Sequence, residues 1–150
     1  MKNLFNSEEA LALTQRVENL TPNHTKKWGK MNAAQMLAHC HIALETARGN
    51  VATKRSFAGK LLGGFFKNKL IIKDAPFAKN SPTVKEFLIK NTCDFNIEKQ
   101  NLLNAIRGFA TNGEGEVTTK PHPFFGQLTP QQWAMAQYKH IDYHLTQFSA

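Results

Sequence analysis

The chain has 150 residues, of which 41% are hydrophobic and 20% are charged, and this composition predicts one soluble globular domain spanning residues 1–150. No stretch approaches the roughly 20 apolar residues of a membrane span, and the first residues lack the apolar run of a signal peptide. We therefore expect a cytoplasmic protein with no membrane span. Cys40 and Cys93 do not form a Cys-x-x-Cys pair, so we expect both thiols to be reduced.

The net charge of +8 is concentrated in one part of the chain. Between residues 53 and 80, only Asp74 opposes a set of basic residues: Lys54, Arg55, Lys60, Lys67, Lys69, Lys73 and Lys79. Clustered cations favour nucleic-acid binding because they neutralise phosphates. This segment, however, contains no zinc finger, RNP aromatic motif or convincing helix-turn-helix, so we do not expect nucleic acid to be the partner.

Two helices are predicted in the first third of the chain. The first begins near Ser7, whose hydroxyl we expect to cap it, and its buried face recurs at steps of three and four: Ala10, Leu13, Val17 and Leu20. The second begins after Asn32, which resembles a capping box with Gln35, and ends near Gly49. Its expected core stripe is Ala33, Met36, Leu37, Cys40, Leu44 and Ala47.

The basic stretch "RSFAGKLLGGFFKNKLII", residues 55–72, favours a helix or a broken helix, with Gly63 and Gly64 weakening its middle. A basic amphipathic segment can also lie on a membrane surface. We expect instead that its apolar residues pack onto the rest of the protein, since Leu61, Leu62, Phe65 and Phe66 suit such packing equally well.

The second half of the chain carries two more helices separated by loops. Pro76 and Pro82 predict a loop over residues 74–87, and residues 111–127 form the longest irregular stretch. A helix is expected over residues 96–109, with the apolar set Ile97, Leu102, Ile106 and Phe109. The last helix has the clearest start, with Thr129 as cap, Pro130 in the first position and Gln132 completing a capping box. Strand-like alternation is limited to a few residues near 70–73 and 116–119, so the predicted fold class is all-α, a helical bundle.

On the last helix, Trp133, Gln137, His140 and His144 form one stripe, since successive steps of four, three and four residues stay on one face. Apolar neighbours widen that stripe, so both imidazoles are expected to point inward. Two histidines at positions i and i+4 can converge on one metal ion, with nitrogen–metal distances of about 2.0 to 2.1 Å. Without a third ligand, two half-buried, hydrogen-bonded histidines explain the pattern better than a metal site does.

The second helix offers candidate third ligands in "AHCH". His39 and His41 each lie about 90 to 110° from the centre of the core stripe, on opposite flanks, so periodicity does not choose between them. Cys40 faces the core better, but a buried lone cysteine is typical of packing. His24 and His122 stand in loops beside prolines, where we expect exposed side chains.

Two blocks carry a family resemblance. "W-G-K-M-N-A-A-Q-M-L-A-H", Trp28 to His39, and "H-P-F-F-G-Q-L-T-P-Q-Q-W", His122 to Trp133, followed by "Y-K-H-I-D-Y-H-L-T-Q-F", resemble the signature blocks of a branch of the DinB/YfiT-like superfamily. Members of that superfamily are four-helix bundles, and many hold a divalent metal with three histidines. The resemblance therefore implies a four-helix bundle with an extra helical segment, and His39, His140 and His144 as metal ligands.

The resemblance also implies a function. Three histidines suit zinc, nickel or iron and leave a position for water or substrate, as in catalytic sites. Some relatives are thiol-dependent transferases, so the expected activity is a metal-dependent transferase or hydrolase acting on a small molecule, with an anionic thiol as a candidate cosubstrate held by the segment Lys54 to Lys73. The alternative is a non-catalytic bundle that acts as a binding module or a homodimer.

The sequence also supports narrower predictions for other polar and aromatic residues near the histidines. No general acid or base is evident, because Asp142 points away from both neighbouring histidines on an ideal helix and is expected at the surface. Gln137, one turn before His140, is a candidate for a hydrogen bond to a ligand histidine or to a bound molecule. Trp28 and Trp133 are expected to be core anchors.

Overall fold

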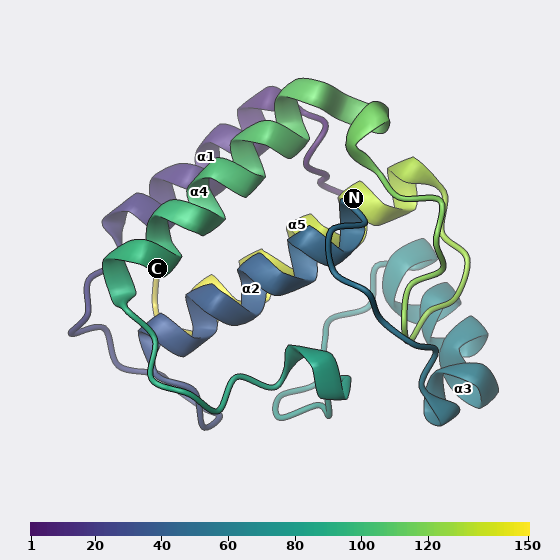
Figure 1. The fold of residues 1–150 in the computed structure, drawn as a ribbon, viewed down its shortest axis with the longest axis horizontal. Helices are drawn as coiled ribbons and strands as arrows, with labels where there is room; N and C mark the ends of the chain where they lie inside the picture. Colours follow the sequence, from purple (N-terminus) through teal and green to yellow (C-terminus); the bar gives the residue numbers. More distant parts are fainter.

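The computed structural model describes all residues 1–150 and is all-helical (Figure 1). It has five α-helices and no strand; a single isolated bridge joins His122 and Gly126. The α-helices are α1 (Ser7–Asn19), α2 (Ala33–Ala47), α3 (Phe57–Lys67), α4 (Phe95–Asn112) and α5 (Pro130–Gln147). Three short segments complete the set: the π-helical η1 (Asn68–Ile72) and the 3-10 turns η2 (Lys85–Phe87) and η3 (Gly113–Glu116). None of these helices combines the length and the apolar character needed to cross a membrane.

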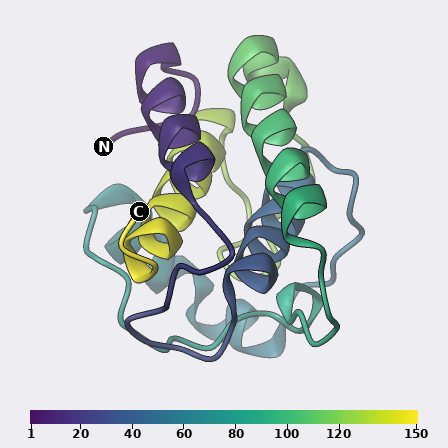
Figure 2. The ribbon, with the colours of Figure 1, turned by 90° about the vertical axis from the view of Figure 1, so that its left-hand side faces the viewer.

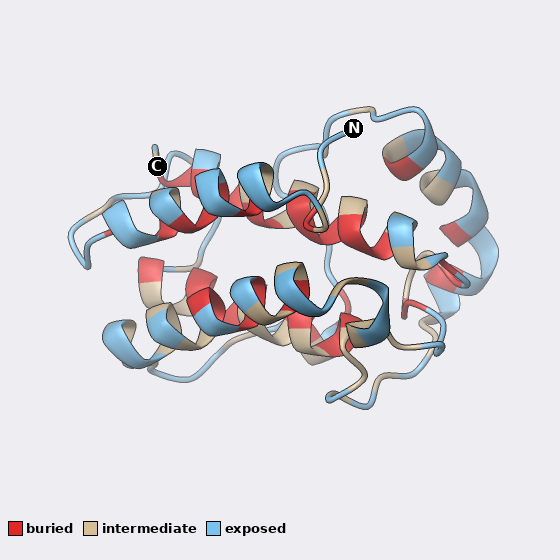
Figure 3. Cartoon of the chain, turned by 90° about the horizontal axis from the view of Figure 1, so that it is seen from above, coloured by how far each residue is buried: buried red, intermediate tan, exposed pale blue.

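Four of the helices surround the main core. α4 packs on α1 and α2, and α5 packs on the same two helices from the other side (Figure 2). Their facing sides hold most of the 25 buried residues of the core cluster, and the burial colours in Figure 3 follow these inward faces. α3 stands apart from this core, at one end of α2 and α5, as Figure 1 shows. The core therefore aligns α2 and α5 side by side, and α3 is left at the edge.

The expected helix starts are confirmed, with one change of cap. α1 begins at Ser7, but the cap is Asn6, whose side-chain oxygen accepts hydrogen bonds from the backbone of Glu8 and Glu9 at 3.0 and 3.1 Å. Asn6 stands one residue before the first helical residue, which is where a cap must lie to reach the free amides of the first turn. The capping boxes of α2 and α5 form as predicted.

The predicted core faces are confirmed except at the start of α4. Every member of the α2 stripe is buried, as are Leu102, Ile106 and Phe109 of α4. Ile97 was expected on that face but is exposed. Its spacing from those three residues turns it roughly 150° away from them on a helix of 3.6 residues per turn. Both cysteines are free thiols, as expected.

Of the four apolar side chains expected to pack α3 onto the protein, only Phe66 does so: it is half-buried, and its ring centroid lies 5.7 Å from that of Phe124. Leu61, Leu62 and Phe65 are exposed, whereas Gly59 and Gly63 are buried. A Cβ added at Gly63 would lie 2.1 Å from the carbonyl oxygen of Phe124, and one at Gly59 would lie 2.7 Å from the same atom. The helix is thus held by close approach of its glycine backbone to the loop at residues 123–125, which only residues without a side chain permit.

This contact predicts opposite effects for two adjacent glycines. Gly63→Ala is expected to lower the free energy of unfolding by about 1 to 3 kcal/mol, because the new methyl group meets backbone and not a movable side chain. Gly64→Ala is the matched control: nothing lies within 4 Å of its added Cβ, and alanine favours the helix by about 1 kcal/mol. Urea denaturation of both variants tests this. Equal effects of the two substitutions would contradict the account of how α3 is held.

Candidate metal centre

Three histidines from two helices converge in the interior. His39 comes from α2, and His140 and His144 come from α5; one ring nitrogen from each lies within 4.8 Å of the others. The Nε2 atoms of His39 and His140 are 2.9 Å apart, and each pair of ring centroids is 4.8 Å apart. His41 is not part of this group, since its Nδ1 lies 3.7 Å from a carboxylate oxygen of Glu98. The packing of α2 against α5 therefore chooses His39, a choice that periodicity left open.

Each of two rings has its Nδ1 engaged by an acceptor. Nδ1 of His39 is 2.8 Å from the backbone carbonyl oxygen of Phe87, and Nδ1 of His144 is 2.8 Å from Oε1 of Gln147. A carbonyl oxygen only accepts, so Nδ1 of His39 carries the proton and donates. In a neutral ring the other nitrogen, Nε2, then keeps a free lone pair. Residue Phe87 belongs to η2, so the loop between α3 and α4 helps to orient the site.

The orientation of the Gln147 amide follows from its second contact. Its Nε2 donates to the carbonyl oxygen of Trp28 at 2.5 Å, so its Oε1 faces His144 and accepts from that ring. His144 therefore also presents Nε2 as its free nitrogen. Gln147 was not predicted as part of the site, although its position three residues after His144 was an available signal. The carbonyl of Phe87 had no signal in the sequence.

Burial keeps all three imidazoles neutral at neutral pH. Desolvation lowers the pKa of His39, against a smaller opposing effect of its hydrogen bond to Phe87. Desolvation lowers the pKa of His144 to about 4, with His39 adding to the effect. The pKa of His140 is lowered well below its ordinary value by burial and by the neighbouring histidines. Neutral imidazole is the form that binds a metal.

Two buried polar atoms beside the cluster have no hydrogen-bond partner: Nδ1 of His140 and Oε1 of Gln137. Both residues lie on the inward face of α5, and Gln137 is buried, as its place in the predicted stripe implied. They are three residues apart, and positions i and i+3 are neighbours on a helix. Since buried polar groups are normally paired, two unpaired ones at the same site mark it as chemically incomplete.

No carboxylate joins the cluster. Asp142 pairs with Arg16 and is partly exposed, which confirms that it faces away from the histidines. Glu45 pairs with Arg48 on the same helix and accepts from Asn50. Both acidic side chains nearest in sequence are thus engaged in ion pairs elsewhere, and the donor set of the site consists of imidazoles.

The two tryptophans differ. Trp133 is a buried core residue as predicted. Trp28 is not: it is only partly buried, donates from Nε1 to the hydroxyl of Tyr143 at 3.0 Å, and lies under the amine of Lys79. It belongs to the loop between α1 and α2, where the packed helices do not enclose it. Its role is to present the carbonyl that holds Gln147.

His122 was expected to be exposed, and the structure buries it. The ring packs against Trp133, with centroids 5.0 Å apart, and Nδ1 accepts hydrogen bonds from the backbone of Phe124 and Phe125 at 3.0 and 3.1 Å. The tight turn at 122–126, closed by the bridge to Gly126, folds the ring inward. Desolvation, with a contribution from Arg55, lowers the pKa of His122 to about 3. His24 remains near the surface, where it bonds Thr21.

The low pKa of His122 predicts a loss of stability in acid. The unfolded chain takes up this proton near pH 6.5 and the folded chain only near pH 3, so stability falls as pH drops through that window, by at most about 1.4 kcal/mol per pH unit. His122→Asn keeps an acceptor for the two amides and removes the titration, so it should reduce this slope, to which the buried His39, His140 and His144 also contribute. Denaturant unfolding between pH 4 and 7 measures it, and an unchanged slope would contradict the assignment.

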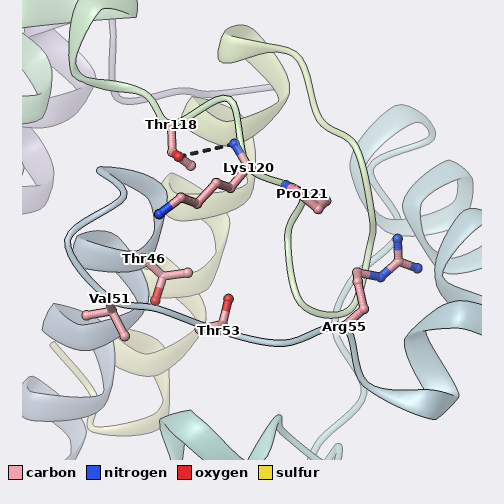
Figure 4. Close-up of a pocket in the computed structure, with 7 residues that line it drawn as sticks. All are labelled: Thr46, Val51, Thr53, Arg55, Thr118, Lys120 and Pro121. Atoms are coloured by element: carbon pink, nitrogen blue, oxygen red, sulfur yellow. Dashed lines mark hydrogen bonds between the residues drawn. The ribbon is translucent and has the colours of Figure 1, made fainter.

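A separate pocket of about 170 Å³ lies at the C-terminal end of α2 (Figure 4). Its lining includes Thr46, Thr118 and Lys120 but none of the three clustered histidines. Thr46 follows His39 by seven residues, which is a rise of about 10 Å along a helix. From the basic segment only Arg55 reaches this pocket, and Figure 4 shows its guanidinium turned away. The histidine cluster, and not this pocket, therefore carries the donor set.

Comparison with known proteins gives a family for the whole chain. No curated protein and no solved structure matches it. Residues 3–150 match the family described as "Protein of unknown function (DUF1569)". Because the match extends over nearly every residue, including both histidine-bearing helices, the chain belongs to the DUF1569 family.

Proposed function

We propose that this protein binds one divalent metal ion, zinc, nickel or iron, through Nε2 of His39, His140 and His144. The observation that carries the proposal is the pair of acceptors behind the rings. The oxygens of Phe87 and Gln147 each accept a hydrogen bond from the Nδ1–H of a ring, which leaves Nε2 with a free lone pair for the shared centre. Histidines that bind a metal through one ring nitrogen usually donate a hydrogen bond of this kind from the other ring nitrogen.

The spacing of the nitrogens suits such an ion. Tetrahedral ligands at about 2.0 to 2.1 Å from zinc stand roughly 3.3 Å from one another. The observed separations range from 2.9 Å, between His39 and His140, up to no more than 4.8 Å in the set. Small side-chain rotations bring these nitrogens to the required distances, since the rings already face one another.

The two unpaired atoms, Nδ1 of His140 and Oε1 of Gln137, favour a bound metal ion over a simple hydrogen bond between His39 and His140. If His140 donated from Nε2 to His39, its Nδ1 would be a buried lone pair with no donor. If Nε2 of His140 is a ligand, Nδ1 carries the proton instead. Gln137, one turn away, has the unpaired acceptor Oε1, and a rotation of its side chain would let it accept from this nitrogen. Gln137 is thus proposed to orient His140.

We further propose that the fold is a DinB/YfiT-like four-helix bundle formed by α1, α2, α4 and α5. In this assignment α3 and η1 are the additional helical segment. The mutual packing of these four helices and the placement of one histidine on α2 and two on α5 support it. The resemblance of the chain to the two signature blocks of that superfamily supports the same assignment.

The activity that this site supports best is a metal-dependent transfer to, or hydrolysis of, a small molecule. When bound, a divalent ion held by three protein ligands supplies Lewis acidity at an open position, which activates a water or a thiol. The protein contributes neutral ligands and a buried setting that strengthens electrostatic interactions. The carboxylates nearest in sequence, Glu45 and Asp142, are held in ion pairs with arginines, so neither is available as a general base.

An assay with the tag-free, metal-loaded protein tests this function. A panel of low-molecular-weight thiols with an electrophile reports transfer, and ester or amide substrates report hydrolysis. Turnover that requires the metal and is lost in His140→Ala supports the proposal. Absence of turnover with every substrate would favour the non-catalytic alternative. Turnover that persists in His140→Ala would show that the activity does not depend on the metal site, and would contradict the proposal.

A further inference from the structure

α3 carries an exposed apolar ridge. Phe57, Leu61 and Phe65 follow one another at steps of four residues, with side chains 77%, 69% and 65% exposed. Leu62 beside them and Ile72 in η1 are exposed as well. Five large apolar side chains thus stand in solvent on one helical segment of 16 residues, Phe57–Ile72. A concentration of this kind is typical of an interaction surface and not of isolated exposed residues.

The glycine contact fixes the direction of this ridge. Gly59 and Gly63 face the loop at 123–125, and Leu61 lies about 180° from their midpoint on an ideal helix. The most exposed line of α3 is therefore its most apolar line. An ordinary surface helix has the reverse arrangement, with its apolar stripe against the core.

The segment is folded before it meets any partner. Ser56 caps α3 by accepting from the amide of Gly59 at 3.0 Å, and Arg55 donates to the carbonyl of Gly59 at 2.6 Å. At the other end Lys67 donates to the carbonyl of Gln127, and Ile71 of η1 is buried in the core. Docking through the ridge would therefore not require the helix to be ordered first.

Cations border the ridge without acidic partners. The exposed lysines are Lys54, Lys60, Lys69 and Lys73, and none of them forms an ion pair. No acidic residue occurs between Glu45 and Asp74, and Asp74 is itself paired with Lys139. Apolar side chains at the centre and unpaired lysines around them complement a surface that is negatively charged outside and apolar beneath.

We propose that α3 and η1 form a docking surface for anionic lipid membranes, with Phe57, Leu61 and Phe65 inserted among the acyl chains and the lysines at the headgroups. Interfacial helices bind through this combination of apolar burial and charge. A second copy of the chain is a poorer occupant, because it would bring two sets of unpaired lysines together. Nucleic acid is also disfavoured, since the exposed residues include aliphatic leucines and an isoleucine that offer no stacking surface.

Vesicle co-sedimentation of the full chain tests the proposal. Binding is expected to vesicles containing equal parts of phosphatidylglycerol and phosphatidylcholine, and to be much weaker with phosphatidylcholine alone. Leu61→Gln with Phe65→Gln should lower the partition coefficient by about tenfold for each side chain. Leu11→Gln with Ile97→Gln is the matched control, because these side chains on α1 and α4 are 59% and 60% exposed, and it should leave binding unchanged.

Charge is tested in the same assay. Lys60→Glu with Lys69→Glu should reduce binding at least about fivefold for each lysine, and the exposed pair Lys27→Glu with Lys90→Glu, which makes the same change in net charge, should reduce it far less. The proposal is overturned if wild type fails to bind anionic vesicles at low salt, or binds them equally after the α3 substitutions. It is also overturned if the same substitutions instead abolish a dimer or binding to single-stranded DNA.

Discussion

Removing the metal with a chelator is expected to lower the midpoint of thermal unfolding of the loaded protein by about 10 °C. An ion that binds only the folded state stabilises it by about 4 kcal/mol when its free concentration is a thousand times its dissociation constant. For a domain of 150 residues, each kcal/mol corresponds to roughly 2 to 4 °C. The expected shift is therefore large, and differential scanning fluorimetry with and without chelator measures it.

Two variants separate this effect from general damage. His140→Ala should melt at the same temperature with and without chelator, because a ligand has been removed. His41→Ala should keep the full chelator-dependent shift, since His41 lies near Glu98 and outside the cluster. The comparison is made within each variant, so any loss of stability from the substitution itself cancels. A wild type that melts identically in both conditions would contradict metal binding.

Gln147→Leu is expected to weaken metal affinity by about tenfold to a hundredfold. The substitution removes the acceptor that holds the Nδ1 proton of His144, and loss of such a partner typically has this effect. Gln147→Glu keeps an acceptor for His144 but cannot donate to Trp28, so it should retain most of the affinity while losing stability. Competition with a chromophoric zinc chelator measures both variants. Gln131→Leu, an exposed position on the same helix, is the control.

An equal affinity for Gln147→Leu and wild type would show that the hydrogen bond at His144 does not orient a ligand. Only the hydrogen bond from Nδ1 of His39 to Phe87 would then orient a ligand of the site, and no side-chain substitution removes that backbone carbonyl. Gln147→Glu controls for unfolding. It is expected to lose stability but to keep most of the metal affinity, so a loss of affinity seen only in Gln147→Leu is not caused by lower stability.

Local rules predicted the elements that carry the site. Capping at Asn32 and Thr129 depends on residues three apart, so it can be read from the sequence, and both boxes form. The stripe that contains His140 and His144 follows from the helical period alone. The choice of His39 over His41 does not, because it depends on how α2 is rotated against α5. That rotation is a property of the packed pair and not of either helix.

Two of the failed predictions, for α3 and for His122, have a common physical origin in contacts made by the backbone. α3 was expected to bury Leu61 and Phe65, and it buries Gly59 and Gly63 instead, because the loop at 123–125 approaches its backbone. His122 was expected in solvent, and two backbone amides draw its ring inward. Backbone groups are alike at every position, so the sequence gives no sign of which ones will meet. The membrane-docking proposal arises from this same unexpected orientation of α3.

The metal content of tag-free protein tests the central claim most directly. After incubation with zinc, nickel or iron and removal of unbound ion, elemental analysis should find about one ion per chain in the wild type and in His41→Ala. His39→Ala, His140→Ala and His144→Ala should each hold almost none, since a site of three ligands loses most of its affinity with any one of them. No retained ion in the wild type, or full occupancy in the three ligand variants, would contradict the assignment.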